Sequence, residues 1–83
     1  MGILSVKMTD KIKVIMSQVF DVLSEDIGSD ASIESIDDWD SVNHMSMIMA
    51  LEQFYGVMFE TDEIIEMVSY RQIVHVLKQK RLM

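Results

Sequence analysis

The chain has 83 residues, no cysteine, 49% hydrophobic residues and a net charge of −7, which together indicate one small folded domain and exclude disulfides, thiolate zinc sites and cysteine nucleophiles. The negative charge disfavours nucleic acids and anionic lipid surfaces as partners and favours basic patches on proteins. No apolar run approaches the roughly 20 residues of a membrane span, and without a secretory signal pattern we expect a cytoplasmic protein.

The chain divides into an expected N-terminal extension over residues 1–8, a folded domain over residues 9–80 and a C-terminal tail over residues 81–83. The first helix is predicted to begin at Thr9 or Asp10, either of which can cap it, and to end near Leu23 or Ser24. Apolar residues recur at helical spacing through this stretch, while polar residues fill the other side of the helix. These apolar residues are Ile12, Ile15, Met16, Val19, Phe20 and Leu23.

A long loop is predicted over residues 24–38, because this stretch is rich in Ser and Asp and contains Gly28. A structureless loop of this length is unusual in a compact domain. We therefore expect it to be ordered by apolar side chains that pack onto the helices, namely Ile27, Ile33, Ile36 and Trp39. Its acidic residues are expected to form a solvated surface. They lack the alternating ligands, central Gly and closing Glu of a calcium loop.

The second helix is predicted from Ser41 to Tyr55, and Gly56 is a good terminating residue. It carries two apolar stripes whose centres lie roughly 120° apart at 100° per residue. The first stripe is Met47, Ile48, Leu51 and Tyr55, and the second is Val42, Met45 and Met49. Either the helix is buried all round, or one stripe meets the core and the other meets partner proteins. Met-rich exposed surfaces suit adaptable recognition.

A short acidic helix is predicted over residues 60–66, with Thr61 as its cap and with Ile64, Ile65 and Met67 facing the core. A capping box from Ser69 to Gln72 predicts the start of the last helix. That helix carries Ile73, Val74, Val76 and Leu77 and ends in the cations Lys78, Lys80 and Arg81. The predicted fold class is all-α, a four-helix bundle of three main helices and one short helix with a long ordered loop between the first and second.

Ser41 is the candidate functional residue, because it stands where the acidic loop gives way to a helix. A hydroxyl at a helix N-terminus usually meets water, and the unpaired N–H groups there favour a phosphate bonded to it. The alternative is that Asp40 or Ser41 is only the N-cap. His44 could approach the Ser41 hydroxyl, but no orienting acid, oxyanion hole or dry pocket is predicted, so we expect no catalytic residue and no enzyme. Two isolated histidines without cysteine predict no metal site.

The chain resembles the acyl carrier protein family. That family has Asp-Ser-Leu at the start of its second helix, apolar residues through the helix, and then Leu-Glu and an aromatic residue. Here Asp40-Ser41-Val42, Met47-Ile48, Leu51-Glu52 and Tyr55 match this pattern without a gap. The agreement covers roughly residues 9–80. The Asp-Ser dipeptide is common by itself, but here it stands at the position that the family pattern requires.

The resemblance implies that Ser41 carries 4′-phosphopantetheine, transferred from coenzyme A by a Mg²⁺-dependent phosphopantetheinyl transferase, and that the thiol of this arm holds acyl groups as thioesters. Asp40 would help position the transferase. The surface for partner enzymes would comprise Val42, Met45, Met49, Glu52, Glu60, Asp62 and Glu63. Such partners are acyl-transferring, condensing or ligase enzymes with basic docking patches, in fatty-acid, polyketide or other specialised biosynthesis. The carrier itself is expected to be a monomer.

Three departures from the family pattern surround Ser41. Trp39 stands where Gly is common, Val42 replaces Leu, and often-acidic positions are taken by Asn43, His44 and Ser46. These departures favour a specialised stand-alone carrier over the housekeeping fatty-acid carrier. The alternative from another class is an unmodified acidic helical module that binds a partner through the Met-rich face of the second helix.

Overall fold

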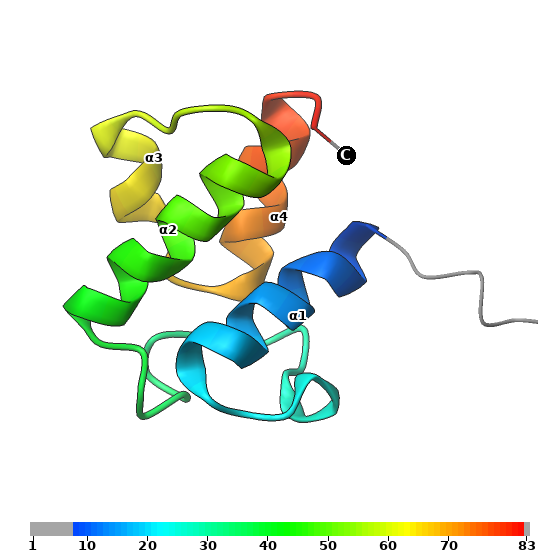
Figure 1. Cartoon of the computed structure of the whole chain (residues 1–83), viewed down its shortest axis with the longest axis vertical. Coiled ribbons are helices and arrows are strands. Elements are labelled where there is room, and N and C mark those ends of the chain that lie inside the picture. The colour runs from blue at the N-terminus through cyan, green and yellow to red at the C-terminus, as the bar shows by residue number, and fades with distance from the viewer. Residues whose placement is uncertain (1–7, 83) are drawn as a thin grey trace, which may run out of the picture.

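The computed structural model describes residues 8–82, which are all-helical, as predicted, and contain no strand. The elements in chain order are α1 (Met8–Phe20), the 3-10 turn η2 (Ser24–Asp26), α2 (Ser41–Tyr55), α3 (Thr61–Glu66) and α4 (Tyr70–Gln79) (Figure 1). The predicted extension lies outside the described residues except for Met8, which begins α1. No helix among residues 8–82 combines the length and the apolar character needed to cross a bilayer.

The end of α1 corrects the prediction, because the helix stops at Phe20 and not near Leu23. Asp21 takes a left-handed conformation with φ 55°, which Asp tolerates better than most non-glycine residues. The N–H of Val22 then donates to the carbonyl of Ser17 over 3.2 Å, which is the hydrogen bond that closes a Schellman-type C-terminus. The chain turns away here, and Leu23 lies exposed on the surface.

The loop over residues 21–40 is fixed at both ends and in its middle. Ile27 and Trp39 are buried, as predicted, whereas Ile36 is half-buried and Ile33 is exposed, which corrects the prediction that it packs inward. The backbone N–H of Ile33 donates to the carbonyl of Val68 over 3.0 Å. This segment therefore pairs with the backbone just before α4, and its backbone contact leaves the Ile33 side chain outside.

One face of α2 is buried and another is exposed. Met47, Ile48 and Leu51 are buried completely, so the first stripe packs in the core. The side chains of the second stripe are 74% (Val42), 43% (Met45) and 55% (Met49) exposed. The prediction of two distinct faces is confirmed, and the alternative of a helix buried all round is wrong.

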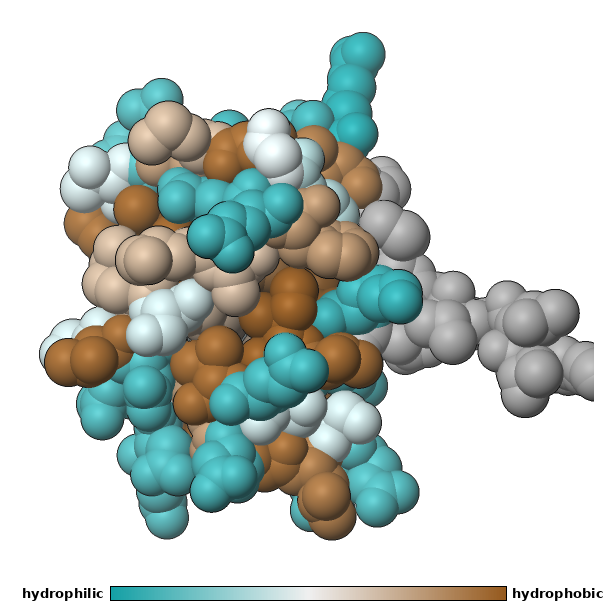
Figure 2. All heavy atoms as spheres, in the orientation of Figure 1, coloured by the Kyte–Doolittle hydropathy of each residue, from teal (hydrophilic) through white to brown (hydrophobic). Residues whose placement is uncertain are grey.

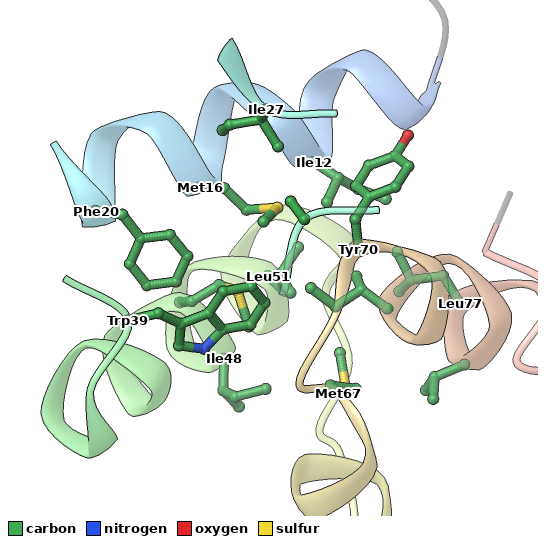
Figure 3. Packing of buried hydrophobic residues seen from close by; sticks show 14 of the residues in the cluster. Ile12, Met16, Phe20, Ile27, Trp39, Ile48, Leu51, Met67, Tyr70 and Leu77 are labelled. Carbon is green, nitrogen blue, oxygen red and sulfur yellow. The ribbon is translucent and has the colours of Figure 1, made fainter. Parts of the chain in front are cut away.

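The core lies where α1, α2 and α4 meet, as Figure 3 shows, with the buried side chains of α1 pointing toward those of α2 and α4. Phe20 at the end of α1 stacks on Trp39, with ring centroids 4.7 Å apart. Trp39 is only 2% exposed. The residue just before the Ser41 motif is thus part of the core, and this fixes the start of α2 to the end of α1.

The short helix α3 has the predicted position but a different cap. Glu60 is the N-cap, and its side chain and that of Glu63 form a reciprocal capping box. Thr61 is therefore the first helical residue, which corrects the prediction. Ile65 is 67% exposed, so it does not face the core, whereas Met67 after the helix is buried as predicted.

The last helix begins and ends with specific caps. Ser69 Oγ accepts from the N–H of Gln72 over 3.1 Å, which confirms the predicted cap. At the other end Arg81 is left-handed, with φ 62°, and the N–H of Leu82 donates to the carbonyl of Leu77 over 2.9 Å. Leu82, which belongs to the predicted tail, packs against the core.

Candidate functional site

The N-cap of α2 is Asp40. Its backbone is extended, and its Oδ1 accepts from the N–H of Asn43 over 2.8 Å. Its carbonyl accepts the first helical hydrogen bond, from the N–H of His44 over 2.8 Å. A carboxylate at this position also interacts favourably with the helix dipole. The cap function that the sequence allowed for either residue thus belongs to Asp40.

Ser41 is the first helical residue and its side chain is exposed. Within residues 8–82 its hydroxyl makes no hydrogen bond, and the backbone N–H groups of Ser41 and Val42 have no partner. These are two of the N–H groups that a helix leaves unpaired at its start, and they carry partial positive charge. The site therefore offers a free hydroxyl beside two free donors.

Two side chains after the cap tie the first turn of α2 to the loop. Asn43 Nδ2 donates to the carbonyl of Asp38 over 2.8 Å. The indole N–H of Trp39 donates to His44 Nδ1 over 3.0 Å, and the two rings are nearly parallel. Because Trp39 is itself buried, Ser41 stands on a helix start that cannot shift without disturbing the core.

His44 is not placed as a general base for Ser41. Both of its ring nitrogens are engaged elsewhere, Nδ1 with Trp39 and Nε2 with the carbonyl of Ile64 at 2.9 Å. A hollow of about 530 Å³ lies against the loop and is lined by residues such as Leu23 and Ile36, but by none from α2, so it does not enclose Ser41. In the part of the chain that the structure describes, no three His, Cys, Asp or Glu side chains are grouped to hold a metal ion.

The second stripe of α2 continues from Ser41 as an exposed apolar strip, formed by Val42, Met45 and Met49. In Figure 2, tan and brown side chains gather over the middle of the face that α2 crosses in Figure 1, and teal side chains surround them. Three exposed apolar side chains in consecutive turns of one helix are suited to burial against another protein.

The predicted acidic contact residues differ in how free they are. Glu52 is half-buried, and its Oε2 accepts from the N–H of Phe59 over 2.9 Å, so this carboxylate closes the turn after α2. Glu60 and Glu63 accept each other's backbone N–H in the capping box of α3. Asp62 is exposed and makes no contact of this kind within residues 8–82. Of these four carboxylates, Asp62 is the one most available to a basic partner.

The carboxylate of Glu63 is the most strongly held. The backbone N–H of Glu60 donates to its Oε1 over 2.8 Å, and Lys80 Nζ lies 3.2 Å from the same oxygen. The Glu60 N–H, and then Lys80, lower the pKa of Glu63 below its usual value. This ion pair joins α3 to the C-cap of α4.

The charges are segregated along the chain, and this signal can be read directly from the sequence. Every Asp and Glu except Asp10 lies between residues 14 and 70, a stretch without Lys or Arg. The loop, α2 and α3 belong to this stretch, whereas α4 and the residues after it carry Arg71, Lys78, Lys80 and Arg81. Ser41 is therefore in the acidic part of the chain, and negative charge repels anionic partners and attracts basic ones.

The Ser41 hydroxyl can act chemically as the acceptor of a transferred group. A free hydroxyl at a helix start can take a phosphate-linked group, and the exposed strip beside it can contact the protein that delivers the group. No protein-family model matches the chain, and no curated protein matches it in sequence. The function is accordingly inferred from the site and from the residues that carry it.

Proposed function

We propose that the chain is an acyl carrier protein in which Ser41 carries 4′-phosphopantetheine. The observation that carries this proposal is the free hydroxyl of Ser41 at the first position of α2, with the capping function taken by Asp40. On this proposal the helices form the four-helix bundle of that family, with an ordered loop before α2. When bound, the arm supplies the thiol that holds acyl groups as thioesters.

The residues around Ser41 fit a phosphodiester. Ser41 Oγ would bond to the phosphorus that bears the pantetheine group, and its proton would pass to the transferase. The pyrophosphate P–O bond of coenzyme A would break, and adenosine 3′,5′-bisphosphate would leave. The unpaired N–H groups of Ser41 and Val42 suit the negative charge of the bonded phosphate. The carboxylate of Asp40 accepts from the N–H of Asn43, and on this proposal it helps to position the transferase.

Partner enzymes would bind the exposed strip and the acidic residues near it. Val42, Met45 and Met49 supply apolar area, and Asp62 supplies a free carboxylate on α3. Such partners are the transferase itself and acyl-transferring, condensing or ligase enzymes with basic docking patches. The acidic part of the molecule would steer them toward Ser41 and make association sensitive to salt. We propose that the carrier works as a cytoplasmic monomer.

The departures from the family pattern support a specialised carrier. Trp39 and His44 are hydrogen-bonded to each other, so two of these departures form one structural unit. The first two turns of α2 carry no acid after the cap, which weakens the expected contact with enzymes that read acids there. We therefore propose a stand-alone carrier of a fatty-acid, polyketide or related pathway with its own partner enzymes.

Incubation with coenzyme A, Mg²⁺ and a phosphopantetheinyl transferase tests the proposal. Intact mass should rise by one phosphopantetheine in the wild type and stay unchanged in Ser41→Ala. Ser46→Ala is the matched control, since Ser46 is an exposed serine of the same helix whose hydroxyl donates to the carbonyl of Val42, and it should be modified like the wild type. A wild-type chain that stays unmodified with several transferases would count against the proposal.

The second candidate is an unmodified acidic module that binds a partner through the same strip. The exposure of Val42, Met45 and Met49 favours it, because the strip does not depend on Ser41. This candidate predicts that Ser41→Ala keeps full function, whereas Met45→Glu abolishes partner binding. The carrier proposal predicts that both variants lose function.

A further inference from the structure

The short helix α3 is held in place by polar contacts and by Ile64, which is half-buried against the core. None of its six residues is buried, and Ile65 is largely exposed. A helix this short has little stability of its own, and segments with few buried apolar contacts open at low free energy. Its contacts with neighbouring elements include the ion pair between Glu63 and Lys80, the C-cap of α4, and the hydrogen bond between the Ile64 carbonyl and His44 on α2.

The hydrogen bonds of His44 define which of its nitrogens carries the proton. The indole nitrogen of Trp39 can only donate, so His44 Nδ1 must accept. The carbonyl oxygen of Ile64 can only accept, so Nε2 must donate. The tautomer with its proton on Nε2 is therefore the one that satisfies both contacts.

The contact with Ile64 is made at the end of α3. The carbonyls of a last helical turn lack partners within the helix, and that of Ile64 receives only a long hydrogen bond of 3.3 Å from the N–H of Met67. His44 Nε2 approaches it more closely, at 2.9 Å. The imidazole thus supplies a donor that α3 needs, and it comes from the first turn of α2, three residues after Ser41.

The other side of the imidazole is anchored in the core. Trp39 is 2% exposed and stacks on Phe20, so its indole N–H has a fixed direction. A continuous path of contacts runs from Phe20 on α1 through Trp39 and His44 to Ile64 on α3. Because Trp39 holds the imidazole of His44 on one side, the imidazole fixes the position of the Ile64 carbonyl on the other side.

We propose that His44 is a positioning residue that holds α3 at a fixed place relative to Ser41, so that a phosphopantetheinyl transferase meets Ser41 and the acids of α3 as one prearranged surface. This inference rests on the proposed function above. Without the contact of His44, the free carboxylate of Asp62 would be less firmly placed relative to Ser41. Prearrangement lowers the free energy lost on binding, so the effect belongs in the KM for the carrier and not in kcat.

Three variants separate the two contacts of His44. The terminal amide of Gln reaches the position of Nε2, so His44→Gln keeps a donor for Ile64. The amide of Asn reaches the position of Nδ1, so His44→Asn keeps an acceptor for Trp39 alone. His44→Ala removes both. The Gln and Asn variants decide the matter if the Ala variant does not fold.

Two readouts are measured on each variant. The first is amide hydrogen exchange at Ile64 and Met67, whose N–H groups donate within α3 to the carbonyls of Glu60 and Glu63, with Ile73 in α4 as the internal reference. The second is KM and kcat for transfer of phosphopantetheine from coenzyme A to the carrier. In His44→Ala and His44→Asn, exchange in α3 should accelerate about fivefold relative to Ile73, the factor for loss of about one neutral hydrogen bond. KM should rise by a similar factor at constant kcat. His44→Gln, which keeps the donor for Ile64 but loses the acceptor for Trp39, should lie closer to the wild type than the other two variants in both readouts.

The outcomes that overturn the inference are distinct from those that overturn the proposed function. Wild-type KM in all three variants refutes the positioning role while the wild type is still modified, and so does rescue by Asn in place of Gln. Faster exchange in α3 with unchanged KM also refutes it, since α3 would then be anchored by His44 without being read by the transferase. Absence of modification in the wild type refutes the proposed function, and the positioning role falls with it.

Discussion

Asp40, and not Ser41, caps α2, and substitutions at these two positions test this assignment. Asp40 Oδ1 accepts from the N–H of Asn43 over 2.8 Å, whereas the Ser41 hydroxyl makes no hydrogen bond within residues 8–82. Loss of an N-cap side chain costs about 1 kcal/mol, within a range of about 0.5–2 kcal/mol. Asp40→Ala also removes the only acid at the start of α2, which adds a few tenths of a kcal/mol at low salt. We expect Asp40→Ala to lower the free energy of unfolding by about 1 to 2 kcal/mol.

Ser41→Ala should change the free energy of unfolding by less than about 0.5 kcal/mol, because an exposed side chain without partners is being removed. Asp40→Asn is the matched control, since Asn caps as well as Asp, and it should keep most of the stability. Urea unfolding followed by the fluorescence of Trp39, the single and buried tryptophan, measures all three variants. For a domain of this size, 1 kcal/mol corresponds to a shift in Tm of about 4–8 °C.

Equal destabilisation in Ser41→Ala and Asp40→Ala would contradict the assignment of Asp40 as the cap, because Ser41 would then contribute to capping. The assignment would also be contradicted by an Asp40→Ala variant as stable as the wild type. The contrast has a functional meaning, because a serine that does not cap α2 can be modified without loss of helix stability.

Two further predictions concern the faces of α2 and the attachment of α3. Met47 is fully buried, whereas Met49, two residues later, is 55% exposed. Met47→Ala should therefore lower the free energy of unfolding by about 2–5 kcal/mol, and Met49→Ala by less than about 0.5 kcal/mol. Similar values for both variants in urea unfolding would contradict the assigned faces. The pKa of Glu63 is lowered in the folded state by the N–H of Glu60 and by Lys80, so its contribution to stability is present above the ordinary pKa of a glutamate and is lost as the pH falls through the lowered value. The protection of α3 amides against exchange, corrected for the intrinsic pH dependence of the exchange rate, should therefore fall on acidification in the wild type and depend less on pH in Glu63→Gln. An equal pH dependence of protection in both would speak against this role.

The second main helix could be predicted to the residue because its local signals agree. Asp40 is a strong cap, Gly56 takes the left-handed conformation with φ 68° after the last turn, and the apolar stripes between them have helical spacing. The two faces were also present in the sequence. Packing against α1 determines which face lies in the core, and the first stripe is the one that is buried.

The errors have identifiable physical causes. Apolar residues at helical spacing continue past Phe20 to Leu23, and the helix ends only because Asp21 adopts a left-handed conformation that is uncommon outside glycine. Glu is not among the preferred N-caps, so Thr61 was predicted where Glu60 caps α3 with the help of Glu63. A six-residue helix has too few turns for periodicity to define its inner face, hence the error at Ile65.

The candidate site was predictable in part. Ser41 and Asp40 could be identified from the sequence, as could the strip that begins at Val42. The contact of His44 with Ile64 joins residues 20 positions apart and depends on where α3 lies, so no local pattern could indicate it. The segregation of charge was readable directly and places Ser41 in the acidic part of the chain.

The most direct test of the central claim is tandem mass spectrometry of the protein purified from its native source. The carrier proposal predicts a phosphopantetheine group on the peptide that contains Ser41, bonded to that serine and absent from Ser46. A native protein at its unmodified mass, or a phosphopantetheine group found on another residue, would contradict the proposal.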